Sequence, residues 1–214
     1  MTPNGLAQEF RAVPASPARK EVLNRYGLED GYLLSVGNLQ PRKNLVRLIH
    51  AYLRLRERRA DFTPKLALVG KPAWLYHDIF RAARDSRYAA DIHFTGYVAE
   101  TDLPAIYSAA RLFIYPSIFE GFGLPVLEAM GCGAPVAVSN SSSLPEVAGG
   151  AAVTFDPLDE SAMMGAIERI WQDPDLSARL RIAGPERARQ FSWRETARLT
   201  LGAYQRAVGM AELR

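Results

Sequence analysis

A short apolar run turns sharply into a helix in the segment Leu112-Phe-Ile-Tyr-Pro-Ser-Ile-Phe-Glu120-Gly-Phe-Gly-Leu-Pro-Val-Leu-Glu128. Its first four residues lack polar alternation, which is typical of a strand buried on both faces of a parallel sheet. Pro125 suits the first turn of a helix, and Gly131 suits the position just after its last turn. The segment therefore predicts a strand over 112–115 and a helix over 125–130, joined by a glycine-rich loop.

The same alternation of apolar runs and helical patterns continues on both sides of this segment. Strands are predicted at 32–36, 65–69, 92–95, 112–115, 135–138 and 152–155, and helices at 45–58, 74–87, 101–109, 125–130 and 160–172. Two more helices are expected after Pro174, divided around Phe191-Ser-Trp193. This order predicts an α/β fold: a Rossmann-like, doubly wound parallel sheet of about six strands with helices on both faces and further C-terminal helices. Residues 1–30 are expected to form an extended lead-in with a short helix near 19–26, and residues 31–214 the folded domain.

The composition narrows the class of protein. Hydrophobic residues make up 48% and charged residues 23% of 214 positions, so a folded soluble protein is expected. A net charge of +3 is too small to indicate nucleic-acid binding. Cys132 is the single cysteine, which excludes an internal disulfide, and its apolar surroundings predict a small buried residue. His50, His77 and His93 have no partner at metal-ligand spacing, so no zinc site is predicted.

The loop that follows the first strand carries two adjacent cations at the start of a helix. It runs Gly37-Asn-Leu-Gln-Pro-Arg-Lys-Asn44, and Asn44 is expected to cap the helix. The spacing is close to that of a nucleotide-hydrolysing P-loop, but Arg42 stands where that motif needs glycine and Asn44 where it needs a hydroxyl, so we reject it. Cations oppose the positive end of a helix dipole, and a bound anion would remove this conflict. The alternative is that Arg42 and Lys43 are ordinary exposed cations.

The glycine-rich loop places a carboxylate on each side of its turn. Free N–H groups at a strand-to-helix turn attract anions, and carboxylates accept hydrogen bonds from sugar hydroxyls. Gly121-Phe-Gly123 also begins a dinucleotide fingerprint, but Val126 replaces its third glycine, so a nicotinamide cofactor is poorly supported. The plain alternatives are a helix-stabilising Glu120 and a surface Glu128, although Glu128 lies among apolar residues where an unpaired carboxylate is costly.

Three further segments leave alternatives open. The loop Ser139–Glu146 supplies hydroxyls and the start of a helix, and its alternative is a plain capping turn. The loop Gly96-Tyr97-Val98 can offer backbone groups to a base or be a simple turn. Asp173-Pro-Asp175 matches the Asp-x-Asp of metal-dependent sugar transferases, but it lies between helical patterns, where Asp caps and Pro begins a helix.

Taken together, these loops resemble the nucleotide-sugar-binding domain of retaining glycosyltransferases of family 4, which have the GT-B architecture. The most specific elements are Glu120 and Glu128, which match the family's Glu-x7-Glu motif, and the loop that ends in Arg42-Lys-Asn44. The resemblance covers nearly the whole chain, from Thr2-Pro-Asn-Gly5, similar to the end of an interdomain linker, to the helices around Phe191-Ser-Trp193. Phe94-Thr-Gly-Tyr-Val98 and Ser143-Leu-Pro-Glu-Val147 agree as well.

The resemblance implies a role for each matching position. Catalytic Arg42 and Lys43 would hold the diphosphate and stabilise charge on the departing nucleotide, and Glu120 would bind hydroxyls of the transferred sugar. Glu128 would bind the ribose. The other implied donor-binding residues are Gly37 and Asn38 in the first loop, Tyr97 and Val98 beside the base, and Gly121, Phe122, Gly123 and Leu124, whose amides face the sugar or phosphate. Many members carry an arginine where this chain has Asn38, which implies that fewer cations hold the diphosphate here unless Arg42 takes that role.

The resemblance also sets expectations for cofactor, partners and place in the cell. No cofactor or metal is expected, because the cations and the helix N-terminus supply the positive charge. The family has two Rossmann-like domains, so we expect a missing N-terminal acceptor domain, a fragment that binds a nucleotide sugar but transfers nothing alone, and a parent enzyme of polysaccharide or glycoconjugate synthesis.

The loop Pro41-Arg-Lys-Asn44 looks similar to that of members using GDP-mannose. A cytoplasmic protein is expected, with peripheral contact at the inner membrane face left open. The rival interpretations are a non-catalytic interaction module and a nucleotide-sugar epimerase of related fold.

Overall fold

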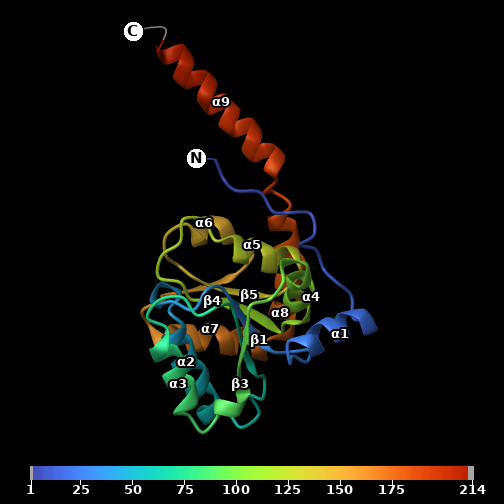
Figure 1. Cartoon of the computed structure of the whole chain (residues 1–214), viewed down its shortest axis with the longest axis vertical. Coiled ribbons are helices and arrows are strands. Elements are labelled where there is room, and N and C mark those ends of the chain that lie inside the picture. The colour runs from blue at the N-terminus through green and yellow to red at the C-terminus, as the bar shows by residue number, and fades with distance from the viewer. Residues whose placement is uncertain (1, 212–214) are drawn as a thin grey trace.

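A computed structural model describes residues 2–211 and shows a single parallel sheet enclosed by helices (Figure 1). Its six strands are β1 (Leu33–Val36), β2 (Leu66–Val69), β3 (Ile92–Gly96), β4 (Leu112–Tyr115), β5 (Val136–Ser139) and β6 (Val153–Phe155). All neighbouring pairs are parallel, in the order β3-β2-β1-β4-β5-β6. The predicted doubly wound α/β fold of six strands is confirmed, and its strand order reverses between β1 and β4.

The helices follow the predicted pattern with two differences. They are α1 (Pro17–Arg25), α2 (Leu45–Arg58), α3 (His77–Arg84), α4 (Leu103–Ala109), α5 (Leu124–Gly131), α6 (Leu144–Ala148), α7 (Glu160–Gln172), α8 (Pro174–Ala188) and α9 (Trp193–Ala211). The helix predicted over 74–87 begins only at His77, because Leu75 has a φ of 52°, a left-handed conformation that cannot belong to a right-handed helix, and it ends at Arg84. The short α6 was predicted only as a helix start.

Successive residues of each strand point to opposite faces of the sheet, which creates two apolar layers. Leu33, Leu112 and Ile114 pack with α2, α3 and α7 on one face. Phe113 and Tyr115 pack with α4, α5 and α6 on the other face. This two-sided burial explains why the strand sequences lack polar alternation.

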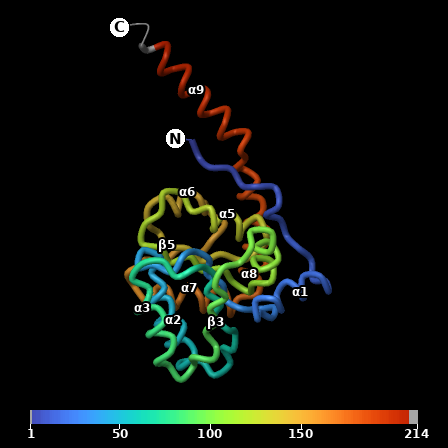
Figure 2. Tube along the Cα trace, viewed as in Figure 1, coloured from blue at the N-terminus to red at the C-terminus, as the bar shows by residue number. Residues whose placement is uncertain are grey.

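The N-terminal residues lie against the body of the domain and beside the start of α9 (Figure 2). The Leu6 N–H donates to the Phe191 carbonyl at 2.9 Å, and the Thr196 hydroxyl donates to the Pro3 carbonyl at 2.6 Å. Phe10 is buried against the ring of Tyr107. From this junction α9 extends away from the body (Figure 1). The domain boundary expected at residue 30 stays a prediction.

Candidate functional site

The loops after β1 and β4 meet at the carboxyl edge of the sheet, where the strand order reverses. In doubly wound sheets this is where ligands bind, because the two loops separate there and leave a crevice. The Ile118 N–H donates to the Arg42 carbonyl at 3.0 Å, which joins the loops directly. Asn44 does not cap α2 with its side chain, contrary to expectation. Its amide instead donates to the carbonyls of Pro116 (3.0 Å) and Pro157 (2.7 Å), and so ties the loops after β1, β4 and β6 together.

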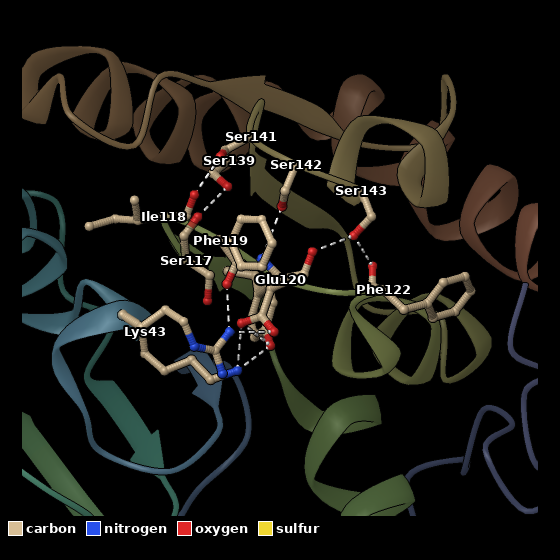
Figure 3. A network of polar contacts seen from close by, with 12 residues as sticks. Lys43, Ser117, Ile118, Phe119, Glu120, Phe122, Ser139, Ser141, Ser142 and Ser143 are labelled. Atoms are coloured by element: carbon tan, nitrogen blue, oxygen red, sulfur yellow. Dashed lines mark hydrogen bonds and ion pairs between the residues drawn. The ribbon is translucent and has the colours of Figure 1, made fainter.

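Two cations and one carboxylate form the centre of this edge (Figure 3). The Lys43 Nζ lies 2.7 Å from Glu120 Oε1, and the Arg42 guanidinium lies 2.8 Å from Glu120 Oε2. Lys43 also donates to the Tyr115 hydroxyl at 2.5 Å, and that hydroxyl donates to Glu120 Oε1 at 3.0 Å. We call these four side chains the cation–carboxylate cluster. It joins residues separated by 77 positions in the chain.

The cluster is buried on one side and open on the other. The side chains of Lys43 and Glu120 are 11% and 10% exposed, whereas that of Arg42 is 37% exposed. Burial raises the pKa of Glu120, but hydrogen bonds from Lys43 and Arg42 outweigh it and hold that pKa below its usual value. Burial lowers the pKa of Lys43, and its hydrogen bond to Glu120 opposes this effect. Glu120 is therefore ionised at neutral pH, and with both bases charged the cluster keeps one positive charge for an anion.

Glu128, the second acid of the motif, has a different environment. It lies on α5, and Tyr107 from α4 donates a hydrogen bond to its Oε2 at 2.8 Å. Burial raises the pKa of Glu128, and the hydrogen bond from Tyr107 only partly offsets this. Glu128 is thus not an ordinary surface residue, and no basic side chain among residues 2–211 forms an ion pair with it.

The loop between the two acids requires its second glycine. Gly123 has a φ of 108°, and a Cβ there would lie 2.5 Å from Leu144 Cδ2. Gly121 to Gly123 lead into α5, which begins at Leu124. Within the described part of the chain, no acceptor takes the N–H groups of Gly121, Phe122 or Gly123. These N–H groups have no protein acceptor at the N-terminus of α5; Gly121 is exposed there, Phe122 is half-buried and Gly123 is buried.

The remaining predicted donor-binding residues differ in how near they lie to the cluster. Gly37 lies beside Lys43, since a Cβ at Gly37 would be 3.1 Å from Lys43 Cε, and Asn38 is exposed. Tyr97 is exposed and Val98 is buried, both after the edge strand β3. The contacts found within residues 2–211 do not connect these two residues to the cluster. Their role beside a base stays a prediction.

The structure reveals site residues that the sequence interpretation missed. Tyr115 lies in a predicted strand and Tyr107 in a predicted helix, and the sequence interpretation gives neither a role in the site, yet their hydroxyls bond to Glu120 and Glu128. A polar atom at the end of a buried strand is the only signal that marks Tyr115. The serines of the loop after β5 were noted as hydroxyls or as a capping turn, and they bond instead to the loop that carries Glu120.

Several other candidates have structural roles. Cys132 is buried, and burial raises the pKa of its thiol to about 12, as expected for an inert residue. The Asp173 side chain accepts from the Leu176 N–H at 2.8 Å and so caps α8. His93 contacts the Tyr26 carbonyl at 2.8 Å. Residues 2–211 contain no cluster of three or more His, Cys, Asp or Glu side chains placed to bind a metal.

A second hollow lies at the opposite edge of the sheet. This cavity of about 310 Å³ lies beside the amino ends of β1 and β2 and is lined by residues that include Gly27, Tyr32, Lys65 and His93. Ligands of doubly wound sheets bind at the carboxyl ends, where the strand-to-helix loops supply polar groups. The cation–carboxylate cluster is therefore the better candidate site. None of the helices within residues 2–211 combines the length and apolar character that crossing a bilayer requires.

The known proteins that this chain resembles are glycosyltransferases and a sugar-phosphate synthase. A family model for glycosyl transferases group 1 matches residues 20–187. The O-antigen chain mannosyltransferase B of Escherichia coli is 41% identical over 196 residues, which cover 90% of this chain and 51% of that protein. The serotype-specific mannosyltransferase WbdA of Escherichia coli is 35% identical over 205 residues, covering 95% of this chain and 25% of that protein. The solved sucrose-phosphate synthase of Thermosynechococcus elongatus matches with a TM-score of 0.76 at 28% identity, covering 98% of this chain and 52% of that structure. The chain thus spans about half of the first and third of these relatives and a quarter of the second.

Proposed function

Because this chain belongs to the group 1 glycosyl transferases, we propose that it is the donor-binding domain of a retaining glycosyltransferase of family 4 and forms the C-terminal half of a GT-B fold. The observation that carries this proposal is the contact of Arg42 and Lys43 with Glu120 at the switch point of the sheet. Two bases and one acid at a ligand-binding edge suit a ligand that is both an anion and a polyol. A nucleoside-diphosphate sugar has this chemistry.

The two cations have complementary roles in sugar transfer. Cleavage of the bond between the sugar and the diphosphate leaves negative charge on the departing nucleotide. The fork of Arg42 can bind two phosphate oxygens at once, and Lys43 acts as a compact point charge. Lys43 is already fixed by Glu120 and Tyr115, so it need not be reorganised when the charge develops. This arrangement would supply positive charge without a bound metal.

The two acids recognise different hydroxyls in this proposal. Glu120, beside the cations, would accept hydrogen bonds from the transferred sugar. Glu128 has one oxygen held by Tyr107 and would offer the other to the ribose. The N–H groups of Gly121 to Gly123 would face the sugar or the phosphate. The mannosyltransferases among the relatives favour mannose as the transferred sugar and a longer parent enzyme of polysaccharide synthesis.

Calorimetry and a transfer assay test the proposal together. The chain should bind GDP or UDP, and the matching sugar nucleotide, with modest affinity, because the other half of the GT-B cleft is absent. It should transfer no sugar by itself, since the acceptor site is expected on the other half. Failure to bind GDP, UDP or their mannose and glucose conjugates would refute the donor-binding role. Full turnover by this chain alone would refute its assignment as half of an enzyme.

A further inference from the structure

The last residue of β5 and the loop after it reach across to the loop that carries Glu120 through four serine hydroxyls (Figure 3). Ser139 donates to the Ser117 carbonyl at 2.6 Å, and Ser141 donates to the Ile118 carbonyl. Ser142 accepts from the Glu120 N–H at 2.9 Å. The single hydroxyl proton of Ser143 is shared between the carbonyls of Glu120 (3.0 Å) and Phe122 (2.8 Å). We call this set the serine clamp.

These hydroxyls are not used for ordinary helix capping. Ser143 occupies the N-cap position of α6, where serine normally accepts a hydrogen bond from the helix. Its side chain makes no such bond and faces the glutamate loop instead. Ser142 has a φ of 53°, a left-handed conformation that costs energy for a residue with a Cβ. Because strain persists where the surroundings enforce it, these two departures point to a role outside α6.

The direction of the hydrogen bonds decides what the clamp does to the loop. Segment 117–123 belongs to no helix or strand, so its backbone needs partners from elsewhere. Three serines occupy carbonyl groups of this segment, while Ser142 fixes the N–H of Glu120 itself. The N–H groups of Gly121 to Gly123 have no acceptor within the described part of the chain. The loop therefore keeps donors for a ligand, while its carbonyls are largely occupied: serines bond to those of Ser117, Ile118, Glu120 and Phe122, and Arg42 bonds to that of Phe119.

We propose that the serine clamp is a positioning element for nucleotide-sugar binding: Ser142 and Ser143 hold the backbone of Glu120 so that its carboxylate meets Arg42 and Lys43 and the following N–H groups face the ligand. The clamp does not touch the reacting atoms in this proposal. It acts through Glu120 and the loop amides, and it rests on the proposed donor-binding function. Contact between Gly123 and Leu144 continues the same interface.

Calorimetry with GDP and UDP on single variants tests the clamp. Ser143→Ala removes the hydroxyl that donates to the loop carbonyls, whereas Ser143→Thr keeps it. We expect Ser143→Ala to weaken the tighter-binding nucleotide about tenfold, and Ser143→Thr to restore most of this loss. Ser142→Gly relieves the strained φ but removes the hydroxyl, so it should also weaken binding while the melting temperature holds or rises. Ser161→Ala, on the exposed first turn of α7, is the matched control and should bind as the unmodified chain does.

The outcomes separate this proposal from the one it rests on. If the unmodified chain binds neither nucleotide, the donor-binding function fails, and the clamp's role fails with it. If the unmodified chain binds but Ser143→Ala and Ser142→Gly bind within twofold of it, the positioning role alone is refuted. A loss in Ser143→Ala that Ser143→Thr does not restore would also refute it, because the hydroxyl would not be what matters.

Discussion

Glu120 and Glu128 belong to one nine-residue stretch but occupy opposite electrostatic environments. Glu120 is held by Lys43, Arg42 and Tyr115, and its pKa lies below the usual value because these contacts outweigh burial. Glu128 is held by Tyr107 alone, and burial raises its pKa. Glu120 holds the two cations of the site in place, whereas the charge of Glu128 is only partly compensated, by the hydrogen bond from Tyr107. The charge of Glu128 contributes nothing to folding. Its burial is therefore better explained by a role in ligand binding, in which hydroxyl groups of the ligand would donate hydrogen bonds to its carboxylate.

Of the substitutions considered, removal of the Lys43 ammonium should change stability and nucleotide binding most. Lys43→Met keeps the length of the side chain but leaves Glu120 buried with one base fewer. We expect a loss of about 3 kcal/mol in the free energy of unfolding, since an acid that loses its buried partner keeps the desolvation cost. Nucleotide binding should fall about a hundredfold or more.

Urea denaturation and calorimetry measure these two effects, with Lys20→Met as the exposed control. The double variant Lys43→Met/Glu120→Gln should recover part of the stability but none of the binding. Unchanged stability in Lys43→Met would show that the ion pair contributes nothing to the fold.

Neutralising each acid should shift stability in opposite directions. Glu128→Gln keeps an acceptor for Tyr107 and removes a poorly compensated charge, so the free energy of unfolding at pH 7 should rise by about 1 kcal/mol. Nucleotide affinity should fall about tenfold if the ribose contact is lost. Glu120→Gln should lower stability, because it leaves two cations without their acid. Urea denaturation and calorimetry of both variants measure these effects, with Glu21→Gln as an exposed control. If the free energy of unfolding changed in the same direction in both variants, the two acids would not differ in the way described here.

The pH dependence of these shifts should differ as well. Glu120, with a lowered folded pKa, stabilises the fold above its unfolded pKa of 4.5, and this stability is lost as pH falls through the folded pKa. Glu128, with a raised folded pKa, begins to destabilise the fold as pH rises past 4.5, and the cost is complete above the folded pKa. The change in the free energy of unfolding caused by each substitution should therefore become smaller as pH falls. For Glu128→Gln this decrease should occur above pH 4.5, and for Glu120→Gln it should occur below pH 4.5. Denaturation curves measured from pH 3 to 7, at values spaced by about one unit, would locate the two pH ranges. Ranges that coincide would contradict this account.

The tyrosine partner of Glu128 should have the smallest effect. Tyr107→Phe removes one hydrogen bond and preserves the packing of the ring, so stability should fall by about 1 kcal/mol. The pKa of Glu128 should rise further, because the bond from Tyr107 favours its ionised form. A pH titration of nucleotide binding would detect this as a loss of affinity that begins at a higher pH than in the unmodified chain. Tyr204→Phe on the exposed α9 is the control, and an unchanged titration would show that Tyr107 does not tune Glu128.

The sequence predicts the fold well because local chemistry decides its elements. Short, mostly apolar runs mark the six strands, and α2 and α7 begin and end where predicted. The shortened α3 escapes prediction because nothing in the sequence marks the left-handed conformation of Leu75. The same holds for Asn44, whose side chain bonds to carbonyls that are distant in the chain.

The site is predictable in its charged residues but not in its supports. Arg42, Lys43 and Glu120 are conspicuous because their charges sit in strand-to-helix loops of the predicted sheet. The supporting contacts join residues that are 5 to 23 positions apart in the sequence, and they are made by Tyr107, Tyr115 and the serine clamp. Their sequence context is equally consistent with core packing or capping, so only the folded arrangement distinguishes these roles.

A crystal structure of the chain with GDP or UDP bound would test the central claim most directly. This account predicts diphosphate oxygens within about 3 Å of the Arg42 guanidinium and the Lys43 ammonium, with the ribose hydroxyls at Glu128. A nucleotide seated at the opposite edge of the sheet, in the cavity between Gly27 and His93, would contradict it.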